Sequence, residues 1–190
     1  EHHISNDCLN QFSPTIGLYA NAKRIADLMY AKILMGLNAT KNKFLSESST
    51  YPIIHIASHG IVNEQRPNLS FLALHETDTS EQICESIGAL YASDILATNV
   101  NAKVIFIAAC ETAYDEGIFY KGEGVLSLAR AFTHAGASSV ISTLWKVPIV
   151  ADQNNQSLVS RFYEYLKKGN SKSEALSLAK RDIIQKKDRY

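Results

Sequence analysis

The chain has no excess of charge of either sign and no long hydrophobic run. Nineteen Lys and Arg residues balance nineteen Asp and Glu residues, so no net field draws the protein toward nucleic acid or anionic lipid. The longest apolar runs, such as Val104–Ala109, are far shorter than the ~18 residues that a membrane-spanning helix needs. The N-terminus lacks the apolar core of a signal peptide. We therefore expect no nucleic-acid partner and no membrane anchor within these 190 residues.

Cysteine is scarce as well. The three cysteines, Cys8, Cys84 and Cys110, are odd in number and widely separated. This pattern excludes a disulfide framework and lacks the paired spacing of a thiolate metal site. Because free thiols persist in a reducing compartment, the sequence predicts a cytoplasmic protein.

Motifs for metals and cofactors are also lacking. His55 and His59 are four residues apart, but no glutamate stands between them as in a zinc-binding helix. The Gly122-Glu123-Gly124 segment lacks the third glycine of a dinucleotide-binding turn. The sequence therefore predicts neither a metal nor a cofactor.

What the chain does contain is an ordinary globular composition with alternating strand and helix patterns. Hydrophobic residues make up 46% of the chain, enough for one compact core. Expected strands cover Ile53–Ala57, Ser70–Leu74, Lys103–Ala109 and Ser138–Trp145. Expected helices cover Leu18–Ile33, a short stretch from Thr40 to Leu45, Ser93–Thr98, Val125–Ala135, Leu158–Leu166 and the segment after Ser171. This order predicts an α/β fold with a mostly parallel sheet and helices on both faces.

Two reactive side chains follow apolar strands directly. Cys110 comes after Lys103–Ala109, and His59 lies in Ser58-His59-Gly60, which we interpret as the loop that ends the first strand. Because the carboxyl ends of parallel strands share one edge of a sheet, the two side chains are expected within mutual reach. A histidine beside a thiol favours the nucleophilic thiolate and can protonate a leaving amine. Taken singly, each residue is more commonly structural, but their spacing of 51 residues (110 − 59) is close to that of caspases.

Several segments, in this order, resemble the CHAT domain, a caspase-like and separase-like cysteine peptidase family from the clan of caspases and gingipains. The first is Ile54–Gly60, and the second is Val104–Thr112 with its Ala109-Cys110-Glu111-Thr112 core. The others are Gly122–Phe132, Ala135-Gly136-Ala137 with Ser139-Val140-Ile141, Leu144–Val147, and Phe162-Tyr163 before Leu166. Ala113, where the family commonly has glycine, and Pro148–Val150 depart from its pattern.

The resemblance implies a fold, a site and an activity. The fold would be a three-layer, caspase-hemoglobinase-like sandwich, and residues 1–190 a single peptidase domain, a fragment of a larger protein without its final strand. By resemblance Cys110 is the nucleophile and His59 the acid and base, while the backbone N–H groups of Gly60 and Cys110 form the oxyanion hole. Arg130 and Glu123 match recurrent family positions, and we interpret both residues as structural or loop-positioning.

The function expected from these residues is that of a cysteine endopeptidase acting on protein or peptide substrates. A different class remains open: a catalytically silent, caspase-like scaffold or signalling module that acts by protein binding. An acyltransferase or other thiol enzyme on the same fold is a third alternative. The family often carries tetratricopeptide repeats, so a regulatory partner or an upstream repeat domain is expected.

Overall fold

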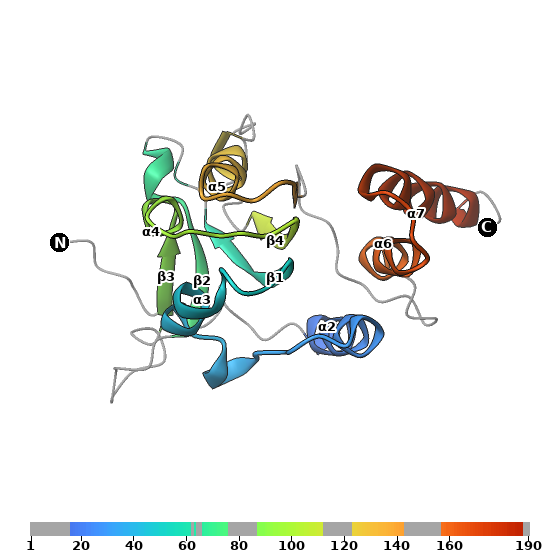
Figure 1. The fold of residues 1–190 in the computed structure, drawn as a ribbon, viewed down its shortest axis with the longest axis horizontal. Coiled ribbons are helices and arrows are strands. Elements are labelled where there is room, and N and C mark those ends of the chain that lie inside the picture. Colours follow the sequence, from blue (N-terminus) through green and yellow to red (C-terminus); the bar gives the residue numbers. More distant parts are fainter. Residues whose placement is uncertain are drawn as a thin grey trace. The chain divides into compact units, whose positions relative to one another are not determined.

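The computed structural model describes residues 16–61, 63, 66–75, 87–111, 123–142 and 157–187. The chain divides into two compact units (Figure 1). Unit 1 consists of Glu1–Ser13 and Leu34–Val147, and unit 2 of Pro14–Ile33 and Pro148–Tyr190.

Unit 1 is built on a five-stranded sheet. Its strands are β1 (Ile53–Ile61), β2 (Phe71–His75), β3 (Ile87–Tyr91), β4 (Val104–Glu111) and β5 (Val140–Ser142). They are ordered β3-β2-β1-β4-β5. Strands β1, β4 and β5 run parallel, whereas β2 and β3 pair antiparallel at the other side of β1. The predicted α/β class is confirmed, with a mixed sheet whose parallel half contains the two strands that carry the candidate site.

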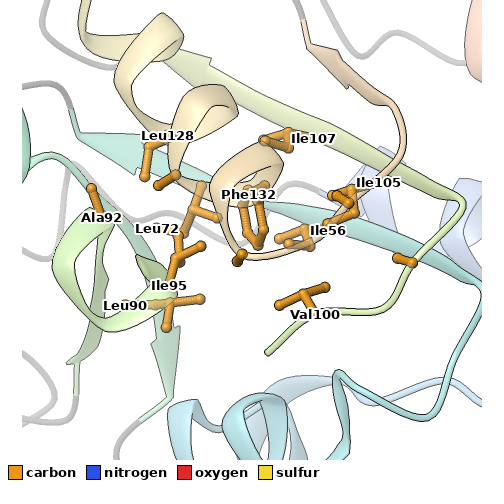
Figure 2. Close-up of a cluster of buried hydrophobic side chains, with 14 residues drawn as sticks. Ile56, Leu72, Leu90, Ala92, Ile95, Val100, Ile105, Ile107, Leu128 and Phe132 are labelled. Carbon is orange, nitrogen blue, oxygen red and sulfur yellow. The ribbon is translucent and has the colours of Figure 1, made fainter. Parts of the chain in front are cut away.

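The core of unit 1 lies between this sheet and helices α4 (Ala92–Leu96) and α5 (Glu123–His134), as Figure 2 shows. Phe132 of α5 is fully buried, together with Leu72, Leu90 and Ile105 from three strands. Helix α3 (Lys41–Glu47) adds Phe44, whose ring meets that of Phe132 edge to face at a centroid distance of 6.1 Å. The described residues of unit 1 also include two short 3-10 turns, η1 (Gly36–Asn38) and η2 (Pro67–Leu69).

Helix ends in the structure follow from local chemistry. Thr40 caps α3, because its side-chain oxygen accepts a hydrogen bond from the Lys43 N–H at 3.2 Å. Gly136 ends α5 with a φ of 108°, and the next N–H, from Ala137, donates to the Phe132 carbonyl at 3.0 Å. A Cβ atom at position 136 would lie 2.9 Å from the Val100 carbonyl oxygen. Glycine is therefore required there by both conformation and space.

In the described residues of unit 2 there are three helices: α2 (Ile16–Met29), α6 (Leu158–Lys167) and α7 (Lys172–Lys187). The α6–α7 pair is joined by Gly169, which has a φ of 90°. As predicted, Ser171 and Glu174 form a capping box at the start of α7: the Ser171 N–H donates to Glu174 Oε2 at 3.0 Å, and the Glu174 N–H donates to Ser171 Oγ at 3.3 Å.

Polar contacts attach α2 to α6 within unit 2. Asn21 Nδ2 donates to Ser157 Oγ at 3.0 Å, and the buried Ser160 hydroxyl donates to Asn21 Oδ1 at 2.7 Å. Arg24 forms an ion pair with Glu164 at 2.8 Å. Hydrogen bonds between buried or partly buried polar groups thus join two segments that are more than 130 residues apart in the sequence.

Some predicted boundaries are wrong. Helix α2 ends at Met29 instead of Ile33, because Tyr30 adopts a φ of 52° and the Ala31 N–H turns back to the Ala26 carbonyl. Strand β3 was not predicted. The strand expected over Ser138–Trp145 begins at Val140, and its residues beyond Ser142 lie outside the described part of the chain.

Candidate active site

Strands β1 and β4 bring the two predicted site residues together. The strands lie side by side in parallel, in register from Ile53 with Val104 to Gly60 with Glu111. Within this ladder His59 is the direct partner of Cys110. Neighbouring strands are about 4.8 Å apart, so the two Cα positions are within reach of a side-chain contact. The topology thus places an imidazole-bearing and a thiol-bearing residue beside each other near the carboxyl ends of both strands.

The structure corrects one expectation about His59. Ser58-His59-Gly60 is not a loop, because β1 continues to Ile61. Two neighbours hold this extension: β4 pairs with it as far as Gly60, and β2 pairs with Gly60 and Ile61 through Leu72 and Phe71. Cys110 and Glu111 likewise belong to β4. Both site residues therefore stand on paired backbone, which fixes their positions more tightly than a loop would.

His55 precedes His59 by four residues and shares its face of β1, since successive residues of a strand alternate between faces. The His55 ring lies 5.3 Å from the ring of Phe106 on β4, measured between centroids. Burial lowers the pKa of His55 to about 4. His55 is accordingly neutral at physiological pH and adds no positive charge beside the site.

The lowered pKa of His55 predicts how stability depends on pH. In the unfolded chain histidine binds a proton below about pH 6.5, whereas folded His55 stays neutral until about pH 4. The unfolded state therefore binds more protons than the folded state between about pH 6.5 and pH 4. As pH falls through this range, His55 lowers the free energy of unfolding by up to about 1.4 kcal/mol per pH unit. We expect His55→Phe to reduce the loss of stability between pH 7 and pH 4.5 in urea titrations. His134→Ala, at an exposed histidine, is the control; equal slopes in all three proteins would contradict the prediction.

Gly60, predicted to form part of the oxyanion hole, is buried in β1 between Leu72 of β2 and Glu111 of β4. Beside it, the Ser58 hydroxyl donates a hydrogen bond to the Ala73 carbonyl of β2. Sequence reasoning missed Ser58. The sequence does contain a signal: Ile54, Ile56 and Ser58 lie on the same face of β1, and Ser58 places a hydroxyl where the two preceding residues have apolar side chains.

Other predicted features can be located only in part. Arg130 is exposed on α5, and Glu123 is the first residue of that helix. Ala113 and Pro148–Val150, which depart from the family pattern, lie outside the described residues. Within the described part, no group of three or more His, Cys, Asp or Glu side chains is arranged to hold a metal ion. None of the helices described is both long and apolar enough to cross a membrane.

Comparison with known proteins gives a family and two relatives. A family model described as "CHAT domain" matches residues 5–190. Tetratricopeptide repeat protein 28 of Mus musculus is 25% identical over 191 aligned residues, covering 86% of this chain and 8% of the mouse protein. Its counterpart in Homo sapiens is 30% identical over 98 residues, covering 52% of this chain and 4% of the human protein. The chain thus spans less than a tenth of the length of these relatives.

Proposed function

The chain belongs to the CHAT domain family, whose fold is caspase-like, and from that premise we propose that it is a cysteine endopeptidase. The observation that carries the proposal is the register of His59 with Cys110 on adjacent parallel strands. A thiol nucleophile needs a neighbouring base and acid, and this register supplies the neighbour without any large rearrangement of the backbone.

The proposed reaction proceeds through an acyl-enzyme. Cys110 Sγ attacks the carbonyl carbon of the peptide bond, and its proton passes to His59. His59 then protonates the leaving amine as the C–N bond breaks. Water attacks the thioester with His59 as the base, which releases the new carboxylate and restores the Cys110 thiol. The backbone N–H groups of Gly60 and Cys110 are proposed to hold the oxyanion, where loss of one such donor typically costs about 2.7–4 kcal/mol of transition-state stabilisation.

The test is cleavage of a proteome-derived peptide pool, read by mass spectrometry. We expect the full-length protein to produce cuts that share a residue preference, and we expect Cys110→Ala to produce none, because no other group replaces the nucleophile. Cys84→Ala is the matched control, since it removes a thiol that the proposal does not use. The observed cuts would also define the preferred residue at the cleavage site.

Cuts that persist in Cys110→Ala would contradict the proposal. Cuts absent from every protein would instead favour the alternative, a caspase-like module that acts by protein binding. One observation is compatible with that alternative: both relatives are named for tetratricopeptide repeats and not for a peptidase activity. Binding of the chain to a repeat segment of its own full-length protein, measured in the absence of cleavage, would support it.

The proposal also covers the extent of the domain, its substrates and its cellular compartment. We take residues 1–190 as one peptidase domain built from both units, within a larger protein that includes repeats. Its substrates are proteins or peptides, and it works without a cofactor. We place it in the cytoplasm, where a catalytic thiol stays reduced.

A further inference from the structure

Strand β1 pairs with β4 over most of its length but with β2 only near its carboxyl end. Strand β4 pairs with it from Ile53 to Gly60, whereas the pairing with β2 consists of two positions, Gly60 with Leu72 and Ile61 with Phe71. At its other end β2 contacts a different segment: the His75 N–H donates to the Ala39 carbonyl at 2.9 Å, and His75 forms a bridge with Thr40. The β1–β2 ladder therefore ends at Gly60, the residue after His59.

The Ser58 hydroxyl joins β1 to β2 just beyond the end of this ladder. It donates a hydrogen bond to the carbonyl of Ala73, the residue that would face His59 if the antiparallel ladder continued. On its other side Ser58 is in register with Ala109, the neighbour of Cys110. Ser58 is partly buried, and most hydroxyls in such positions have a hydrogen-bond partner. The Ser58 side chain thus supplies a hydrogen bond between β1 and β2, as backbone groups do elsewhere in the sheet.

We propose that Ser58 is a positioning residue for His59: its hydrogen bond to Ala73 fixes the end of β1 against β2, and thereby holds the imidazole at the distance from Cys110 that proton transfer requires. This inference rests on the proposed function. Ser58 itself does not touch the substrate in this scheme. Small displacements of a catalytic group cost activity steeply, so one hydrogen bond in the backbone frame has a large kinetic effect.

The experiment measures alkylation of Cys110 by iodoacetamide against pH, resolved for each cysteine by mass spectrometry in the full-length protein. We expect Ser58→Ala to lower the Cys110 rate at pH 7 about tenfold, because a thiol without a well-placed imidazole is only a few per cent thiolate at that pH. Ser58→Thr, which keeps the hydroxyl, is expected to retain the wild-type pH profile. Thr133→Ala is the matched control: it removes a hydroxyl that donates to the Ala129 carbonyl on α5, and it should change nothing.

The His59→Ala variant distinguishes failure of the proposed Ser58 role from failure of the proposed Cys110–His59 dyad. If His59→Ala shifts the pH profile of Cys110 but Ser58→Ala does not, the role of Ser58 is overturned while the dyad stands. If neither variant shifts it, the dyad fails, and the role of Ser58 fails with it. Should Ser58→Ala not fold, the comparison of Ser58→Thr with Ser58→Val decides, since these differ by one hydroxyl at nearly equal volume. A wild-type pH profile in Ser58→Val would overturn the inference.

Discussion

His59→Ala is expected to lower kcat/KM for peptide cleavage by roughly 10³-fold, within the range typical of a lost general acid and base. The reason is geometric as well as chemical. His59 is the direct register partner of Cys110, so the imidazole is proposed both to accept the thiol proton and to return it to the leaving amine. Its removal should therefore slow acylation and deacylation alike. Steady-state kinetics on a peptide identified from the pool experiment measure the effect.

The shape of the loss distinguishes a catalytic role from a structural one. His59→Ala should lower kcat with little change in KM, and it should remove the acid limb of the pH profile of kcat/KM. His134→Ala, which removes an exposed histidine in the last turn of α5, is expected to keep wild-type kinetics. A His59→Ala protein that retains more than a tenth of the wild-type kcat/KM would remove His59 from the mechanism.

Phe132→Ala is expected to destabilise unit 1 by about 3–5 kcal/mol, the usual cost of deleting a buried aromatic ring. Phe132 is fully buried between α5 and the sheet, where it shares the cluster in Figure 2 with Ile56 and Ile107. These two residues belong to β1 and β4, so the cavity would lie beneath the strands that carry His59 and Cys110. Urea unfolding followed by circular dichroism measures the loss.

Two further variants make the Phe132 result specific. Thr133→Ala, at the next and exposed position of α5, should change the unfolding free energy by less than about 0.5 kcal/mol. Phe44→Ala combined with Phe132→Ala should cost less than the sum of the two single variants, because the two rings are in edge-to-face contact. A loss below about 1 kcal/mol for Phe132→Ala would show that this ring does not organise the core. Strict additivity would show that the contact with Phe44 adds no coupling energy.

The parts of the fold that the sequence predicted well are those decided by local chemistry. The run from Val104 to Ala109 predicts a buried strand, and β4 begins with four buried residues, Val104–Ile107, because a continuous apolar segment must be covered on both faces. Gly136 and the Ser171–Glu174 capping box mark real helix ends, because their signals act within one turn of the helix.

The parts that it missed depend on distant partners. Strand β3 contains Gly88 and Ala89, which have weak strand preference, and it exists because β2 pairs with it along its length. Ser58-His59-Gly60 is typical of a loop by composition, yet β2 and β4 hold it as strand. The sequence could place His59 and Cys110 at one sheet edge. It could not give their register, which depends on how two strands about fifty residues apart align.

The polar contacts between α2 and α6 set an order of events during synthesis. Asn21 leaves the ribosome before its partners Ser157 and Ser160, which follow 136 and 139 residues later. At about 5–20 residues per second, this delay is on the order of ten seconds. The sequence of unit 1 from Leu34 to Val147 is complete before those partners appear. Helix α2 is therefore an isolated, marginally stable segment while the sheet of unit 1 forms, and unit 2 forms only after α6 has been synthesised.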